Sequence, residues 1–171
     1  MRKSPSDSTV LLTCFAALGA ATLLGLGIAP ASAATISRSV DVRASASAVW
    51  SLIGPFCAIK DWLPPVGECI EDGKTPLTRV LVTKDGKAAF VETQTARNDN
   101  EHTYSYAFVS SPLPVSNYKA TIKVTAKGDG SSTITWSGSY VPDGGKEKAA
   151  SEALIGVYEA GLTQIIARFA K

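Results

Sequence analysis

Apolar residues recur at steps of three and four along residues 144–171, the last part of the chain. This spacing places them on one face of an α-helix, and Glu152, Glu159 and Thr163 fall on the opposite face. No proline interrupts the segment after Pro142. The pattern predicts one long amphipathic helix, whose apolar face consists of Ala150, Leu154, Val157, Tyr158, Gly161, Leu162, Ile165 and Phe169.

Between residues 35 and 141, short stretches alternate apolar and polar residues, which is typical of strands that bury one face. Every second residue from Tyr118 to Val124 is apolar, for example, and the residues between them are lysine or threonine. Turn sequences such as Lys84-Asp85-Gly86 separate the stretches. Seven strands are predicted, at Thr35–Val42, Val66–Ile70, Thr78–Thr83, Lys87–Ala96, Thr103–Val109, Tyr118–Lys127 and Ser132–Val141.

Two short helices are predicted after the first strand. Ser45 is a suitable N-cap for a helix over Ala46–Ile53, and Phe56–Trp62 forms a further turn before Leu63-Pro64-Pro65 makes the chain extended. Together the elements predict an α+β fold, in which a curved antiparallel sheet of about seven strands wraps around the long C-terminal helix. We expect a cavity between sheet and helix, because a concave sheet exceeds what one helix covers.

Gly161 lies on the apolar face of the predicted long helix and has two interpretations. It either lets the helix backbone approach the sheet closely or leaves volume for a ligand. In the second case, replacing Gly161 by leucine would reduce ligand uptake more than stability. As an interior helix residue, glycine costs about 1 kcal/mol relative to alanine.

The first 33 residues are predicted to be a signal peptide and not part of the fold. Arg2 and Lys3 precede an uncharged apolar run, Val10–Ile28, and Ala31-Ser32-Ala33 has the small residues of a cleavage site. Cleavage there leaves a single domain, residues 34–171, in the periplasm or outside the cell and without a membrane anchor. The alternative is an uncleaved anchor, because the run is nearly long enough to span a bilayer.

Composition narrows the range of partners. The formal net charge is only +2, which favours neither nucleic acid nor an acidic surface as a partner. In an oxidising compartment, Cys57 and Cys69 either form a disulfide or remain two small buried apolar residues. The single histidine, His102, lacks Cys or carboxylate partners at the spacing of a zinc site. Neither a metal nor a cofactor is predicted.

The stretch VWSLIGPFCAIKDWLPPVGEC, residues 49–69, resembles the helix-grip or START-like superfamily, as do Arg79, Val91-Glu92-Thr93 and Ser116-Asn117-Tyr118. This superfamily contains START lipid-transfer domains, the birch-pollen allergen, polyketide cyclases and plant abscisic acid receptors. The chain looks most similar to bacterial SRPBCC proteins of the polyketide cyclase/dehydrase-like kind, many of them exported. The resemblance covers essentially all of residues 34–171, and it implies the helix-grip fold with a hydrophobic cavity.

The chain departs from the plant receptors at three positions. Leu63 stands where a polar residue of those receptors holds the carboxylate of the ligand. Lys84-Asp85-Gly86 is shorter than their gate loop, and Leu113-Pro114-Val115 replaces their latch. The resemblance therefore does not imply hormone sensing by closure of a gate.

Glu92 is the central residue of the predicted site, because the resemblance implies that it points into the cavity. A buried carboxylate needs a partner, and Arg79 on the preceding strand is the candidate. The pair either orients a ligand or serves only as an internal ion pair that fixes the register of the sheet. The other predicted ligand-binding residues, whose aromatic members could equally be plain core residues, are Trp62, Leu63, Phe90, Tyr106, Phe108, Asn117, Tyr118, Tyr158 and Leu162.

We expect an exported binding or carrier domain for a small hydrophobic or amphipathic ligand, such as a lipid. One alternative is a polyketide cyclase/dehydratase-like enzyme, in which Glu92 or a cavity tyrosine moves protons. Another is an accessory protein that binds a periplasmic dehydrogenase, as one related exported group is thought to do. No second catalytic group is visible beside Glu92, which favours a binding domain over an enzyme.

Overall fold

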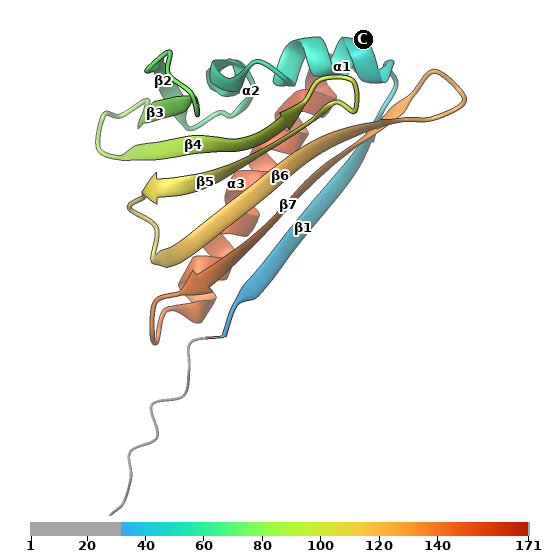
Figure 1. The fold of residues 1–171 in the computed structure, drawn as a ribbon. Coiled ribbons are helices and arrows are strands. Elements are labelled where there is room, and N and C mark those ends of the chain that lie inside the picture. Colours follow the sequence, from blue (N-terminus) through green and yellow to red (C-terminus); the bar gives the residue numbers. More distant parts are fainter. Residues whose placement is uncertain (1–31, 171) are drawn as a thin grey trace, which may run out of the picture.

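The computed structural model describes residues 32–170, so the predicted signal peptide, residues 1–33, lies almost wholly outside the described residues. The described chain forms a seven-stranded antiparallel sheet, a short 3-10 helix and three α-helices (Figure 1). In chain order these are β1 (Ala34–Val42), α1 (Ala46–Ile53), η1 (Phe56–Ala58), α2 (Ile59–Trp62), β2 (Val66–Glu71), β3 (Thr78–Thr83), β4 (Ala89–Asn98), β5 (Thr103–Ser110), β6 (Val115–Ala126), β7 (Ser132–Pro142) and α3 (Glu147–Arg168).

The sheet has the order β1-β7-β6-β5-β4-β3-β2, so every strand from β2 to β7 pairs with its neighbour along the chain. The first strand, β1, pairs with the last, β7. The long helix α3 packs across one face of this curved sheet, and α1 and α2 lie along one end of it (Figure 1). The α+β helix-grip architecture predicted from the sequence is confirmed. None of the described helices is both long and apolar enough to cross a membrane.

Strand β4 is shifted by two residues, from the predicted Lys87–Ala96 to Ala89–Asn98. Two other differences from the predicted elements have local reasons. Strand β6 begins at Val115 and not at Tyr118, because its pairing with β7 shifts register between Ser116 and Lys119. Asn117 has a φ of 53° at this shift, so the alternation of buried and exposed residues is interrupted there. The segment predicted as one helix over Phe56–Trp62 divides into η1 and α2.

Side chains on the predicted buried faces form one core. The Ser45 hydroxyl accepts a hydrogen bond from the N–H of Ala48 at 3.3 Å and caps α1, which buries Val49 and Ile53 completely. On α3 the buried residues recur at the spacing that the sequence predicts, and Val157 and Phe169 are half-buried at its margin. The buried residues of α3 are Ala150, Leu154, Tyr158, Gly161, Leu162 and Ile165.

Gly161 brings the backbone of α3 into close contact with aromatic side chains. A Cβ at this position would lie 3.0 Å from Cζ3 of Trp136, 3.1 Å from Cζ3 of Trp62 and 3.2 Å from Cδ1 of Leu63. The space above Gly161 is therefore filled by two indole rings and a leucine. The structure favours the close-approach interpretation, and the volume for a ligand lies elsewhere.

We expect Gly161→Leu to lower the free energy of unfolding by about 1–3 kcal/mol or more, because the larger side chain overpacks the core. Gly156, also on α3, is a matched control, since a Cβ there would meet no atom within 4 Å. Gly156→Leu should raise stability by up to about 1 kcal/mol through its higher helix propensity. Urea unfolding followed by circular dichroism measures both, and equal midpoints for the two variants would contradict the close packing.

Candidate ligand-binding site

A small, mainly apolar cavity of about 100 Å³ lies between the sheet and α3. Side chains from six strands, from α2 with the segment that follows it, from the loop between β5 and β6, and from α3 surround it. Most of them come from the buried faces described above. The lining residues are Ile59, Leu63, Pro65, Val66, Leu81, Thr83, Phe90, Glu92, Tyr106, Phe108, Leu113, Tyr118, Trp136, Leu154 and Val157.

Glu92 on β4 is the only ionisable carboxylate among these lining residues, and it is paired with Arg79 on β3. The register of the two strands places them directly opposite each other. Nε and Nη2 of Arg79 each lie 2.6 Å from Oε2 of Glu92. Both residues are buried, with exposed fractions of 0% for Arg79 and 3% for Glu92.

Arg79 is held from behind by the 3-10 helix η1. Its Nη1 donates to the carbonyl oxygen of Phe56, and its guanidinium carbon lies 3.8 Å from the centre of the Phe56 ring. These contacts direct the arginine away from the cavity, whose lining does not include it. Arg79 therefore contacts Glu92 from within the core, and the carboxylate of Glu92 balances the charge of the guanidinium.

Burial raises the pKa of Glu92, and the charge and hydrogen bond of Arg79 act against this rise without cancelling it. Both contacts from Arg79 reach Oε2, whereas Oε1 makes no hydrogen bond with any residue of the described chain. Glu92 lines the cavity, and its Oε1 is free to accept a hydrogen bond from a ligand or a water molecule.

A chain of phenol hydroxyls lies beside Glu92. The indole Nε1 of Trp136 donates to the hydroxyl of Tyr106 at 3.1 Å. The Tyr106 and Tyr118 hydroxyls are 3.3 Å apart, and those of Tyr118 and Tyr158 are 2.8 Å apart. Burial raises the pKa values of Tyr106 and Tyr118 well above the usual range. At neutral pH these phenols are therefore uncharged hydrogen-bonding groups and weak proton donors.

The residues predicted as ligand-binding from the sequence divide into two groups. Six of them line the cavity, namely Leu63, Phe90, Glu92, Tyr106, Phe108 and Tyr118. Trp62 and Leu162 are buried, and Trp62 packs edge-on against Trp136. Tyr158 and Arg79 do not line the cavity but contact residues that do. Tyr158 stacks on Trp136 and shares a hydrogen bond with Tyr118, and Arg79 donates a hydrogen bond to Glu92. Asn117 is exposed, because it sits at the bulge of β6.

Other lining residues were not singled out from the sequence. Trp136 has the inward orientation of its strand, and Leu154 and Val157 lie on the apolar face of α3. The alternation and the helical spacing predict this inward direction, but they do not show which inward residues meet empty space. Ile59, Pro65, Val66, Leu81, Thr83 and Leu113 complete the set.

A disulfide joins Cys57 of η1 to Cys69 of β2, with their Cα atoms 5.5 Å apart. The bridge closes a loop that contains four residues of the cavity wall, Ile59, Leu63, Pro65 and Val66. Of the two alternatives for these cysteines, the structure therefore has the disulfide. The covalent link fixes the segment that covers one side of the cavity.

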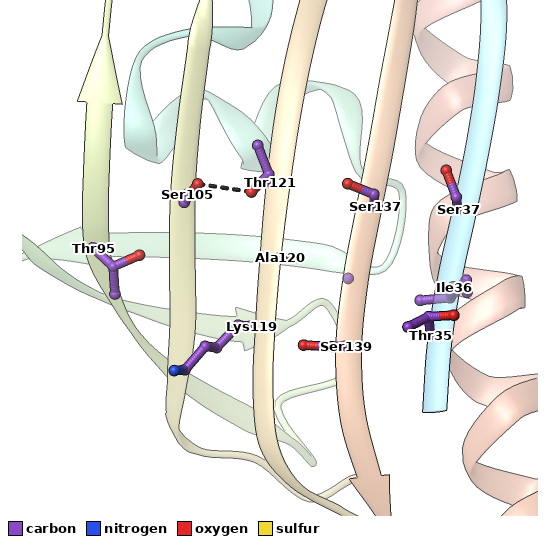
Figure 2. A pocket seen from close by; sticks show the side chains of 11 residues that line it. Thr35, Ile36, Ser37, Thr95, Ser105, Lys119, Ala120, Thr121, Ser137 and Ser139 are labelled. Carbon is purple, nitrogen blue, oxygen red and sulfur yellow. Dashed lines mark hydrogen bonds between the residues drawn. The ribbon is translucent and has the colours of Figure 1, made fainter. Parts of the chain in front are cut away.

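A larger and more open hollow of about 500 Å³ lies on the face of the sheet that points away from α3 (Figure 2). Hydroxyl side chains of neighbouring strands line it, and Ser105 and Thr121 are joined by a hydrogen bond of 2.7 Å. Among the described residues that line it, Lys119 alone is charged. The cavity at Glu92 is the better candidate site, because it combines apolar walls with a buried titratable group.

Within residues 32–170, no group of three His, Cys, Asp or Glu side chains is placed to hold a metal ion. The residues that line the cavity offer a ligand apolar contacts and hydrogen bonds. The lining residues with polar side-chain atoms are Thr83, Glu92, Tyr106, Tyr118 and Trp136.

Comparison with known proteins identifies one matching family and several structures of similar fold. The family model for polyketide cyclase / dehydrase and lipid transport proteins matches residues 33–170. The structure of XoxI from Bacillus cereus is 30% identical, with a TM-score of 0.76 over 81% of this chain and 96% of that chain. An uncharacterised protein from Bacillus thuringiensis is also 30% identical, with a TM-score of 0.75 over 81% of this chain and 100% of that chain. A comparison with curated proteins found no match.

More distant structures share the fold alone. The ZhuI aromatase/cyclase from Streptomyces sp. R1128 is 15% identical, with a TM-score of 0.65 over 81% of this chain and 94% of that chain. The family match spans nearly every described residue, and the resemblance to the START-like helix-grip superfamily is confirmed. The chain therefore belongs to the polyketide cyclase / dehydrase and lipid transport family.

Proposed function

We propose that this protein is a binding or carrier domain for a small hydrophobic or amphipathic molecule, held in the cavity between the sheet and α3. The observation that carries the proposal is an apolar cavity whose wall contains one buried carboxylate with an unbonded oxygen. Membership of a family that includes lipid transport proteins supports ligand binding as the general activity.

The cavity chemistry limits the part of the ligand that enters it. Phe90, Phe108 and Leu154 provide apolar contact, and Oε1 of Glu92 accepts a hydrogen bond from a hydroxyl or amine. An anionic group would find no free cation there, because Arg79 already pairs with Glu92. Burying an unpaired charge is strongly unfavourable, so the group inside the cavity is neutral or cationic.

The size of the cavity indicates a small guest or a movable wall. Pockets for drug-sized ligands usually have volumes of about 300–1,000 Å³, whereas this cavity has about 100 Å³. Leu113, in the loop between β5 and β6, and Leu63, after α2, are its most suitable movable walls because they lie outside regular strands. A larger ligand would displace these residues on entry.

Export to the periplasm or the exterior remains part of the proposal. The charge and apolar pattern of residues 1–33 supports it. The disulfide between Cys57 and Cys69 also supports it, since structural disulfides persist mainly in oxidising compartments.

A cyclase-like enzyme is the second candidate, and the raised pKa of Glu92 is the observation that favours it. A carboxyl with a raised pKa can act as a general acid or base near neutral pH. The binding function is preferred because Glu92 is tied to Arg79 and the neighbouring phenols have raised pKa values. Recovery of a ligand chemically unchanged after long incubation distinguishes a carrier from an enzyme.

Binding is tested with 1-hexanol as a probe in isothermal titration calorimetry, and with native mass spectrometry of protein purified from its own host. We expect saturable hexanol binding at one site. Val157→Phe should lower the affinity at least about tenfold by filling the cavity without loss of stability.

Ile155→Phe is the matched control, because Ile155 is also half-buried on α3 but does not line the cavity. Its hexanol affinity should equal that of the wild type. The proposal would be abandoned if the purified protein is always empty and ignores hexanol, or if both variants bind hexanol as the wild type does.

A further inference from the structure

A basic hollow of about 390 Å³ lies where α2 meets the last turn of α3. Three positively charged residues line it, Lys60, Lys84 and Arg168, against one carboxylate, Asp61. None of the three cations forms an ion pair with another described residue. Among the described residues, the hollow therefore has more positive than negative charge.

Backbone contacts bring these residues together from distant parts of the chain. Nη2 of Arg168 donates to the carbonyl oxygen of Asp61 at 3.0 Å. The N–H of Lys84, in the turn between β3 and β4, donates to the carbonyl oxygen of Pro65 at 3.0 Å. Lys60 lies on α2 itself. The bonds position Lys84 and Arg168 through neutral carbonyl oxygens, so the charges stay available to a ligand.

Leu63 lies between the hollow and the cavity, because it lines both. Trp62 also lines the hollow and is only 1% exposed, yet its indole Nε1 donates no hydrogen bond within the described chain. A buried N–H without an acceptor is unfavourable, and an anionic oxygen is a suitable acceptor for it. The hollow thus places three cations next to a tryptophan whose buried indole N–H has no acceptor among the described residues.

We propose that this hollow is an anion-binding subsite, which takes the phosphate or carboxylate head group of an amphiphile whose apolar part occupies the cavity. The inference rests on the proposed function for the apolar part of the ligand. Within the cavity the charge of Arg79 is matched by Glu92, so an anionic head group has no counter-ion there. Lys60, Lys84 and Arg168 supply that counter-charge on the other side of Leu63.

The test compares four probes on the whole chain: hexanol, hexyl phosphate, hexyltrimethylammonium and inorganic phosphate. Calorimetry should show hexyl phosphate binding at least about tenfold more tightly than hexanol at low salt, with the preference weakened at high salt. Hexyl phosphate should also shift the indole N–H resonance of Trp62. Hexyltrimethylammonium binding as tightly as hexyl phosphate, or inorganic phosphate doing so without a chain, overturns the proposal.

Variants that remove charge test whether the lysines of the hollow cause the preference for hexyl phosphate. Lys60→Gln/Lys84→Gln should reduce the affinity for hexyl phosphate about tenfold and leave that for hexanol unchanged. Lys119→Gln/Lys123→Gln is the matched control, because it removes the same charge from exposed positions on β6. Hexanol binding without any preference for hexyl phosphate overturns this inference alone. If no probe binds, the inference and the proposed function both fail.

Discussion

Replacing Arg79 by methionine is expected to lower the free energy of unfolding by about 3–5 kcal/mol, because it leaves the buried carboxylate of Glu92 without its partner. Arg79 is fully buried and makes both contacts that Oε2 of Glu92 receives. It also anchors η1 through Phe56. Urea unfolding of the variant and the wild type measures the difference.

The double variant Arg79→Met/Glu92→Leu is the control. Replacing both partners of a buried pair by apolar residues of similar volume is often neutral or stabilising. We expect it to recover most of the stability lost in the single variant while it weakens binding of hexanol, which uses Oε1 of Glu92. A double variant as unstable as the single one would show that packing of Arg79, and not its charge, dominates.

The loss of stability caused by Arg79→Met should grow as the pH rises. Arg79 lowers the pKa of Glu92, so its removal lets burial raise that pKa further. A carboxyl whose pKa is higher in the folded state binds more protons there than in the unfolded state. Its contribution to stability is therefore present below the usual glutamate pKa and is lost as the pH rises through the raised pKa.

The measurement is the difference between variant and wild type at several pH values from about 4 to 8. The difference is used because several exposed aspartates give the stability of both proteins a pH dependence of the opposite sign. Hydrogen bonds lower their pKa values, so their stabilisation disappears as the pH falls. They are Asp41, Asp72, Asp85, Asp99 and Asp129. A difference independent of pH would contradict a charged, unpaired Glu92 in the variant.

Removing the disulfide by Cys57→Ala/Cys69→Ala should destabilise the protein by about 3 kcal/mol, the value expected from chain entropy for a loop of this length. The bridge spans a sequence separation of 12 residues. Thermal unfolding with and without a reductant measures the effect. Reduced wild type should melt at the temperature of the double variant, which should not respond to the reductant.

The disulfide variant should also bind hexanol more weakly, because four residues of the cavity wall lie within the closed loop, Ile59, Leu63, Pro65 and Val66. A conservative comparison is Cys57→Ser/Cys69→Ser, which removes the bridge with a similar side-chain volume. Unchanged stability in both double variants would show that hydrogen bonding between β2 and β3 already fixes this segment.

Much of the fold could be predicted because its patterns are local. The three-and-four spacing in α3 and the alternation in β6 and β7 each arise from the geometry of a single element. The start of β6 could not be predicted, because the register shift at Asn117 interrupts the alternation.

The candidate site was predictable only in part. Alternation and strand order together indicate that Arg79 and Glu92 lie on neighbouring strands and face the same side, and the register then places them opposite each other. Tyr158 has the same inward direction on α3 as Leu154, yet it stacks on Trp136 whereas Leu154 meets the cavity. The inward direction of a side chain therefore does not show whether it packs in the core or lines the cavity.

By itself, the sequence determined the order of the elements, the face that each one buries and the family to which the chain is similar, because these depend on periodicity and on short motifs. Only the tertiary structure decided where the core is filled and where it is empty. Gly161 shows the reason: its open side is occupied by Trp62, Trp136 and Leu63, which come from distant parts of the chain. Whether space remains beside a residue depends on the volumes of all its neighbours, and those neighbours are defined only when the sheet and α3 pack together.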